Sequence, residues 1–202
     1  KVAEEGRVEA VADENVELHF ACAKGHPVHL PTCVTEARYM INLASLKSHQ
    51  IGGVTLCAKN HFGSFCEIPA FLHEDIDVKI GPRYTPNPLV ELTAHEHLGG
   101  KTMLFIIDGL YGGQGWEGFI EKWEMPPFLH DWPSTLLVSQ DPVAIDSVGL
   151  DIIGTEFTIP VNSDAYLHEA AEAYDPPSGT TYDPEGKDRR LKSQGVHEHW
   201  NN

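Results

Sequence analysis

The chain contains 202 residues, a length that fits one domain or one domain with a long appendage. Apolar residues make up 41% of it, which is sufficient for a hydrophobic core and excludes a fully disordered polymer. The formal net charge of -16 repels nucleic acid and anionic lipid, so we expect neither as a partner. The sequence has no apolar run of about 18 residues, so we expect no membrane span.

Residues 1–37 carry a weaker pattern than the rest of the chain. Partial alternation of apolar and polar residues over residues 8–20 indicates a strand, and turn signals follow at 25–27 and 30–31. The chain opens on Lys1 rather than on methionine. We therefore expect a processed or incomplete product of a longer precursor.

Three apolar segments predict β-strands, and each leads directly into a polar loop. The strands are expected at residues 38–44, 102–108 and 134–139, and the loops begin at Ser45, Gly109 and Gln140. In open α/β sheets, ligands bind in the crevice beyond the carboxyl ends of the strands. If the three strands are neighbours, their loops form one binding site.

Four segments carry helix signals, at residues 53–61, 88–98, 142–153 and 165–174. The last three are preceded by the capping residues Asn87, Asp141 and Asp164. Helices that alternate with short apolar strands predict an α/β fold with a mainly parallel sheet flanked by helices. Residues 175–202 are rich in Pro, Gly, Asp and Ser, and we expect a long irregular tail packed on this single domain, 1–202.

Lys47 and His49 lie just past the first predicted strand and before the helix expected at 53. The backbone N–H groups of a helix start favour an anion, and Gly52 and Gly53 allow close approach. Lys47 would add positive charge, and His49 could transfer a proton near neutral pH. The alternative is a surface lysine and a hydrogen-bonded loop histidine.

Asp108 ends the second predicted strand as a candidate base, metal ligand or loop cap. Tyr111 and Gln114 follow it in a glycine-rich loop that either forms a nest for an anion or is simply flexible. Asp141 is expected mainly as a helix cap, with Pro142 in the first helical position. Asp146, further along that helix, faces either the sheet edge or solvent.

The four cysteines leave two alternatives open. No Cys-x-x-Cys pair is present, so the usual cysteine spacings of zinc and iron–sulfur sites are absent. Disulfides Cys22–Cys33 and Cys57–Cys66 would fit an oxidising compartment, and four free cysteines are equally compatible with the sequence.

The chain contains 12 histidines, and two His-Glu-His strings are the metal candidates. His95 and His97 lie in the helix expected at 88–98, where residues i and i+2 point about 200° apart and do not readily share an ion. His197 and His199 lie in a segment that reads as extended, where such residues share a face. They predict a site for copper, zinc or iron if a third ligand comes from elsewhere.

Three further histidines carry weaker signals. His26 and His29 flank Pro27 and are poorer candidates for a metal. His168 lies four residues from Glu172, with Asp164 one turn earlier. This spacing indicates a surface salt bridge more than a catalytic pair.

Taken together, several motifs resemble the domain-of-unknown-function family 362. They lie at residues 41–49, 53–55, 59–63, 108–109, 139–146, 164–171, 176–179 and 195–202. The resemblance covers most of residues 38–202 and is weak over 1–37, and its ending looks like a secreted bacterial branch. It implies a recurrent polar set of Lys47, His49, Lys59, Asn60, Asp108, Asp141 and Asp146.

The resemblance also implies redox work, because many members carry a ferredoxin-type segment. This chain lacks the cysteines of that segment, so an iron–sulfur cluster is not expected here. Members usually have a further α/β portion upstream, which again indicates that this chain is a fragment.

Two functions remain open from the sequence. The first is a secreted, extracellular or periplasmic enzyme, redox or hydrolytic, that binds a small anionic or metal-bound ligand at the strand ends. Lys47 and Lys59 would hold negative charge, His49 would serve as acid or base, and Asp108 would orient a metal or a base. The second is a non-catalytic extracellular binding protein or self-assembling subunit, with a homo-oligomer or a carbohydrate ligand. Its acidic surface and four tryptophans fit such contacts, at positions Trp116, Trp123, Trp132 and Trp200.

Overall fold

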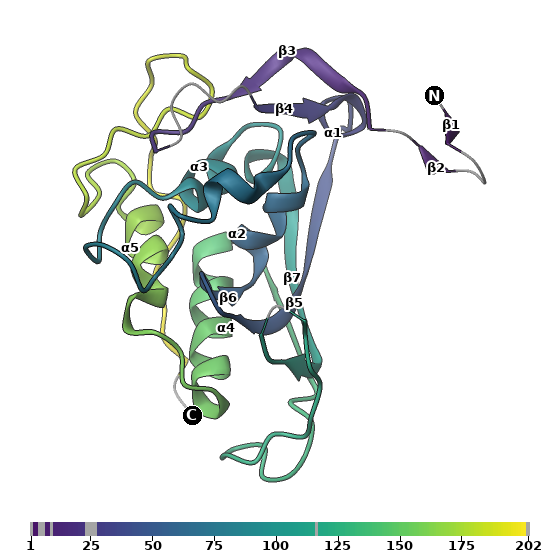
Figure 1. The fold of residues 1–202 in the computed structure, drawn as a ribbon, viewed down its shortest axis with the longest axis vertical. Helices are drawn as coiled ribbons and strands as arrows, with labels where there is room; N and C mark the ends of the chain where they lie inside the picture. The colour runs from purple at the N-terminus through teal and green to yellow at the C-terminus, as the bar shows by residue number, and fades with distance from the viewer. Residues whose placement is uncertain (1, 4–6, 9, 23–27, 116, 201–202) are drawn as a thin grey trace.

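The structure is a computed structural model that describes residues 2–3, 7–8, 10–22, 28–115 and 117–200. Its main element is a four-stranded sheet with the strand order β6–β5–β7–β8. The strands are β5 (Met40–His49), β6 (Gly53–Thr55), β7 (Thr102–Gly113) and β8 (Thr135–Ser139). β5 and β7 are parallel, whereas β6 is antiparallel to β5 and β8 is antiparallel to β7. The fold is therefore α/β with a mixed sheet (Figure 1).

The prediction of a mainly parallel sheet is wrong, and the reason lies in two connections. β5 turns back into β6 through residues 50–52, where we expected a loop and then a helix. β7 continues to β8 through residues 114–134, and the described part of this connection contains no helix. Parallel neighbours need a long crossover, usually helical, whereas antiparallel neighbours can be joined directly. β5 and β7 are also longer than predicted, so much of the expected loops belongs to the strands.

Five α-helices occur in the described residues: α1 (Thr32–Thr35), α2 (Cys57–Asn60), α3 (Pro88–Ala94), α4 (Pro142–Glu156) and α5 (Ala165–Ala171). Short 3-10 turns complete them: η2 (His61–Gly63), η3 (Pro69–Leu72), η4 (Gly99–Lys101) and η5 (Val161–Asp164). The helix predicted at 53–61 is wrong over its first half, because Gly53 begins β6 with a φ of 76°.

Two of the three predicted helix caps are present in the structure, and one is absent. The Asp141 carboxylate accepts hydrogen bonds from the N–H groups of Val143 and Ala144. The Asn87 side chain accepts from the N–H of Leu89, so both of these predictions are confirmed. Asp164 precedes α5 but makes no side-chain capping bond, so that prediction is wrong. Its carboxylate is instead engaged by other side chains.

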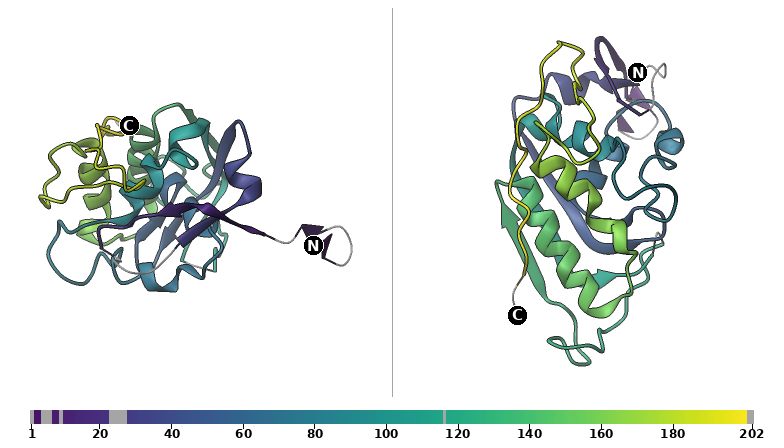
Figure 2. Two further views of the ribbon diagram at one scale, coloured as in Figure 1. Left: turned by 90° about the horizontal axis from the view of Figure 1, so that it is seen from above. Right: turned by 90° about the vertical axis from the view of Figure 1, so that its left-hand side faces the viewer.

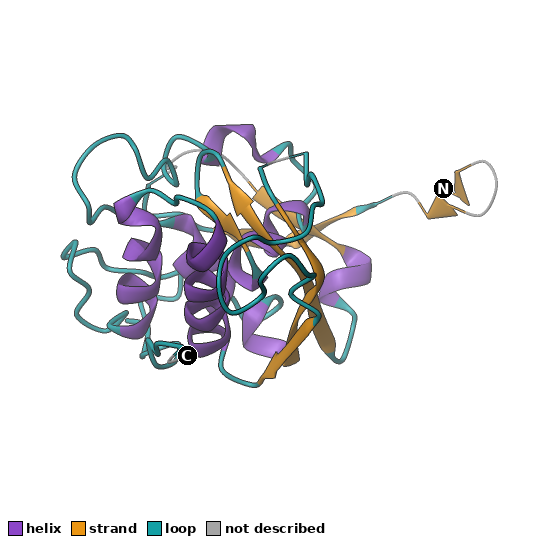
Figure 3. Ribbon diagram, turned by 90° about the horizontal axis from the view of Figure 1, so that it is seen from below, coloured by secondary structure: helices purple, strands orange, loops and turns teal. Residues whose placement is uncertain are grey.

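Helices α2 to α5 lie on one face of the sheet, as Figures 1 and 3 show, whereas α1 contacts β3 and β4. α4 packs against β5, β7 and β8, and the buried side chains between them form the core. The opposite face carries an aliphatic row across three strands, because Leu43, Ile106 and Val138 are aligned neighbours. Leu43 is 60% exposed and Val138 is 53% exposed. The sheet therefore has a covered face and an open apolar face.

The N-terminal region forms two small separate sheets. β3 (Ala12–Leu18) confirms the strand predicted within residues 8–20, and it pairs with β4 (Val28–Pro31), where we expected a turn. β1 (Val2–Ala3) and β2 (Arg7–Val8) form a hairpin that projects from the body in Figure 2. The turn signal at 25–27 lies outside the described residues.

Residues 175–200 contain no helix or strand and run along the body beside α4 and α5 (Figure 2). Backbone N–H groups attach this tail at two carboxylates: Val196 donates to Asp141, and Trp200 donates to Asp151. The N–H of Gln194 donates to the carbonyl of Ala170. The hydroxyl of the buried Tyr182 also donates to Glu169. The tail is therefore held in place by hydrogen bonds to the body rather than by secondary structure of its own.

The four cysteines, all in described segments, form no disulfide with one another. Cys57 is buried, whereas Cys33 and Cys66 are exposed.

Every helix in the described part of the chain is too short or too polar to cross a lipid bilayer.

Candidate functional site

The turn between β5 and β6 is closed by a histidine side chain. The Nδ1 atom of His49 accepts hydrogen bonds from the N–H groups of Ile51 (3.2 Å) and Gly52 (3.1 Å). An atom that accepts two hydrogen bonds carries no proton, so the neutral ring of His49 holds its proton on Nε2. Burial, with the charges of Lys59 and Lys47, lowers the pKa of His49 from 6.5 to about 4. At neutral pH His49 therefore presents an N–H donor.

Gly53 is required where this turn becomes β6. Its φ of 76° is unfavourable for other residues, and a Cβ atom there would lie 2.1 Å from the hydroxyl oxygen of Ser163. The close approach holds the β5–β6 turn against η5.

A second basic side chain comes from α2. The Nζ atom of Lys59 lies 3.5 Å from Nε2 of His73 and 3.3 Å from the ring centre of Phe62. Burial, with the charge of Lys47, lowers the pKa of Lys59 from 10.5 to about 8. The ring of His73 stacks on that of His49 with centroids 6.2 Å apart. We call Lys47, His49, Lys59 and His73 the basic cluster.

The basic cluster unites three residues that the sequence indicated with one that it did not. His73 lies in the irregular stretch 64–87, which carries no periodic pattern that would point to it. Only the packing of this stretch against α2 and the β5–β6 turn brings it to Lys59 and His49. No carboxylate in the described residues lies within ion-pair distance of Lys59.

Two hollows adjoin this end of the sheet. The larger, of about 730 Å³, is lined by His49 and Gln114 together with Lys79 and Glu117. The smaller, of about 180 Å³, is lined by Lys47, Asp108 and Tyr111. The predicted trio of Lys47, His49 and Asp108 thus occupies the same end of β5 and β7 but divides between two hollows.

Asp108 and its neighbours are exposed. The Asp108 side chain lies on the open face of the sheet, and one of its oxygens accepts a hydrogen bond from the N–H of Leu110. The ring of Tyr111, 56% exposed, packs edge-on against Trp132. Gln114 pairs through its backbone with Phe119, and Trp116 lies outside the described residues.

Asp141 lies at the other end of the sheet from Asp108. Because β8 is antiparallel to β7, Ser139 pairs with Phe105 while Thr135 pairs with Gly109. The carboxyl end of β8 therefore points away from the carboxyl ends of β5 and β7. The prediction that all three strand ends form one site is wrong for the third strand.

Asp146 is fully buried and organises the start of α2. Its carboxylate accepts hydrogen bonds from the N–H groups of Cys57 (2.8 Å) and Ala58 (2.9 Å) and from the hydroxyl of Tyr166 (3.1 Å). Burial raises the pKa of Asp146 to about 6, although these hydrogen bonds oppose the rise. Asp146 thus fixes the helix that carries Lys59 and faces neither solvent nor either hollow.

Asn60 is also engaged by the protein. Its amide group donates hydrogen bonds to the side-chain oxygen of Asn42 and to the carbonyl of Leu43. The Asn42 amide in turn donates to the carbonyl of Cys57 and to Nε2 of His61. This network joins α2 to β5.

The histidine strings behave differently from each other. α3 ends at Ala94, so the premise that His95 and His97 share a helix is wrong, and the buried Nδ1 of His95 accepts from the N–H of His97. The ring centre of His197 lies 4.5 Å from that of His168 and 4.9 Å from that of His199, so the predicted pair lies close together. His199 also pairs with Asp151 through Nδ1.

The other histidine pair is only partly described. His29 bonds to Glu67 through both its N–H and its ring. His26 lies outside the described residues.

Comparison with known proteins identifies the family. The family model of the domain of unknown function (DUF362) matches residues 1–151, which include the strands, α2 and all four members of the basic cluster. No curated protein and no solved structure matches the chain significantly. The motifs at 164–202 lie beyond the matched range. The family resemblance inferred from the motifs is confirmed, and the chain belongs to the DUF362 family.

Proposed function

We propose that the basic cluster binds a small anionic ligand and that the chain works as a secreted, extracellular or periplasmic enzyme on that ligand. The observation that carries the proposal is Lys59, whose ammonium group lies against His73 and whose pKa is lowered to about 8. Although the net charge of the chain is -16, basic side chains lie together in this cluster, and the positive charge of one lowers the pKa of another. A bound anion would relieve that repulsion.

Two features suit the cluster to a carboxylate or phosphate group. Lys47 and Lys59 supply positive charge, and an ammonium group acts as a point charge with three donors. His49 supplies a neutral N–H donor on the wall of the larger hollow. Such a donor stabilises negative charge that develops on a ligand oxygen during a reaction. The reaction class is hydrolytic or redox.

Binding of inorganic phosphate and of acetate tests the proposal, with wild type and Lys59→Met compared by titration calorimetry at pH 7. We expect the substitution to weaken binding about tenfold or more, since a hydrogen bond to a charged group contributes about 1.5–3 kcal/mol. The matched control is Lys187→Met, which removes an exposed lysine paired with Glu96. Equal affinity in wild type and Lys59→Met would contradict the proposal.

The pH dependence provides a second readout of the same binding. Lys59 is charged in the folded protein below pH 8 and loses its proton as pH rises through about 8. A bound anion raises the pKa of Lys59, so binding takes up protons. Affinity is therefore expected to be full below pH 8 and to fall above it, with a smaller fall in Lys59→Met.

The open apolar face of the sheet favours the second function, a self-assembling subunit, with a second copy of this chain as the occupant. Ile41, Leu136 and Val138 are each more than half exposed on this face, and soluble monomers rarely leave large apolar patches uncovered. Net charge opposes the contact, so salt should strengthen it by screening.

Sedimentation velocity at rising protein concentration tests this alternative. We expect a dimer or larger species that Leu43→Glu converts to monomer, because the substitution places a charge in the apolar row. Ile80→Glu, at a loop position 69% exposed, is the control and should leave the size unchanged. A monomeric wild type at all concentrations and salt levels would exclude self-assembly through this face.

A further inference from the structure

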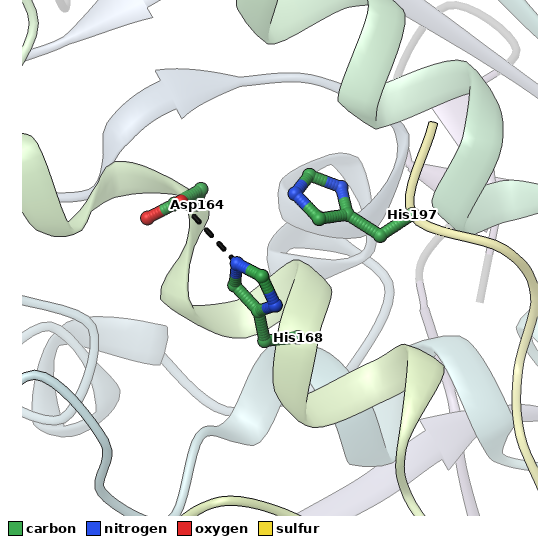
Figure 4. A group of neighbouring side chains, drawn as sticks. All are labelled: Asp164, His168 and His197. Carbon is green, nitrogen blue, oxygen red and sulfur yellow. Dashed lines mark ion pairs between the residues drawn. The ribbon is translucent and has the colours of Figure 1, made fainter. Parts of the chain in front are cut away.

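Three potential metal ligands converge where α5 meets the C-terminal tail. They are Asp164, at the end of η5, His168 on α5, and His197 on the tail (Figure 4). One ligand atom from each lies within 4.8 Å of the others. Asp164 and His168 share a helix face because they are four residues apart. His197 lies beside them because the N–H of Val196 is held by Asp141, the N-terminal cap of α4.

The Asp164 carboxylate has one oxygen in use and one without a partner. Its Oδ2 accepts from the guanidinium of Arg83 at 2.7 Å and lies 3.4 Å from Nε2 of His168. Its Oδ1 is buried and has no hydrogen-bond partner among the described residues. A buried carboxylate oxygen without a partner is costly and calls for a water or an ion beside it.

The tautomer of His197 is fixed by Ser147 on α4. The Ser147 hydroxyl donates its single hydrogen to the carbonyl of Val143 at 2.7 Å. It can therefore only accept from Nδ1 of His197, which lies 2.7 Å away. Nε2 of His197 is then left with its lone pair exposed, in the form that a metal ion requires. Metal-binding histidines are commonly oriented in this way through their second ring nitrogen.

We propose that Asp164, His168 and His197 bind one divalent first-row transition-metal ion and leave a coordination position open. Two histidines and one carboxylate suit zinc or iron(II) in sites of this kind. Ligands around a tetrahedral ion stand about 3.3 Å apart when each lies about 2.0–2.1 Å from it. In the structure the ligand atoms lie within 4.8 Å of one another, so binding would draw the three side chains together. Oδ2 of Asp164 would keep its bond to Arg83, and Oδ1, which has no other partner among the described residues, would bind the ion. The site is independent of the basic cluster.

This group differs from the pair that the sequence indicated. His199 shares the tail with His197, but its Nδ1 lies 3.2 Å from a carboxylate oxygen of Asp151. His199 is also the more exposed, with a side chain 68% accessible. It therefore makes a matched control: a histidine two residues from His197 that stands outside the ligand group.

The experiment titrates the full chain, first stripped with a chelator, with Zn²⁺ by calorimetry and with Co²⁺ by visible absorption. We expect one ion per wild-type chain. Removal of a residue that only orients a ligand lowers metal affinity about 10–100-fold, and we expect a loss in this range for Ser147→Ala. His168→Ala and His197→Ala remove a ligand itself and should lower metal affinity further. His199→Ala should bind as wild type does. Lys59→Met should also keep the ion, which separates this test from that of the anion site.

Three outcomes would overturn the proposal. The first is a wild type that binds neither ion at micromolar concentration. The second is unchanged binding in both His168→Ala and His197→Ala. The third is a loss in His199→Ala equal to that in His197→Ala, which would place the ion at the tail histidines alone. Circular dichroism of each stripped variant confirms its fold, and Ser147→Ala keeps the test decisive if a histidine variant does not fold.

Discussion

Asp146→Ala is expected to lower the free energy of unfolding by about 3–5 kcal/mol, because three buried donors lose their acceptor at about 1–3 kcal/mol each. The donors are the N–H groups of Cys57 and Ala58 and the hydroxyl of Tyr166. We expect a smaller loss of stability than the largest possible sum of these three hydrogen-bond costs. Burial raises the pKa of Asp146 to about 6, so its charged carboxylate is itself destabilising at pH 7. Urea denaturation measures the change through the transition midpoint.

Two milder variants separate the contributions of the carboxylate and of the Tyr166 hydroxyl to this loss of stability. Asp146→Asn keeps one amide oxygen as acceptor and should cost less than Asp146→Ala. Tyr166→Phe removes one donor and leaves the carboxylate bonded to α2, so it should cost about 1 kcal/mol. Asp146→Ala should also weaken phosphate binding, because α2 carries Lys59. A loss below 1 kcal/mol in Asp146→Ala would show that α2 does not depend on this carboxylate.

Acidification from pH 6.5 to about 4 is expected to destabilise the protein through His61. Nε2 of His61 accepts a hydrogen bond from the side-chain amide of Asn42 at 3.0 Å. The other hydrogen of that amide is donated to the carbonyl oxygen of Cys57. Protonated His61 would turn an N–H toward that amide. Burial lowers the pKa of His61 from 6.5 to about 4, in agreement with this geometry.

The sign and size follow from proton linkage. Between pH 6.5 and about 4 the unfolded chain binds a proton at His61 that the folded chain does not, so stability falls as pH falls. The loss approaches about 3 kcal/mol for this group, at about 1.4 kcal/mol per pKa unit. Asp146, whose pKa is raised to about 6, acts in the opposite direction and binds its proton first in the folded state. His49 and His95, whose pKa values are also lowered to about 4, lose stability over the same pH range, so the net acid profile combines several groups.

Comparison of variants isolates the contribution of His61. His61→Gln should flatten the acid limb of the stability profile relative to wild type, as measured by urea denaturation at several pH values. Asn60→Ala is the matched control, because it disrupts the same network without removing the titrating group. It should lower stability by a similar amount at each pH. Parallel profiles for wild type and His61→Gln would contradict the assignment.

Local signals were read correctly where a few neighbouring residues decide the outcome. Asp141 followed by Pro142 predicts a helix start, and the Asp141 carboxylate caps α4 as expected. The apolar segments at 38–44, 102–108 and 134–139 each overlap a strand of one sheet, although β5 begins at Met40 and β8 at Thr135. Cap chemistry acts over two or three residues, so the sequence indicates it. A tertiary partner can still divert the capping side chain, as Arg83 does at Asp164.

The direction of a strand within the sheet cannot be predicted from such local signals. An apolar strand has the same pattern in either direction, and only the route of residues 114–134 makes β8 antiparallel to β7. That direction sends Asp141 to the far end of the sheet and separates it from Asp108. Similarly, nothing near His73 in the sequence indicates that its ring will meet Lys59 and His49.

The sequence by itself determined the family, the α/β class and three strands of the main sheet, and it indicated Lys47, His49 and Lys59 as candidate site residues. Only the tertiary structure decided the mixed sheet, the buried capping role of Asp146 and the meeting of Asp164 and His168 with His197. The reason is physical: propensity and capping act along the chain, whereas charge clusters and ligand groups depend on which distant segments pack together.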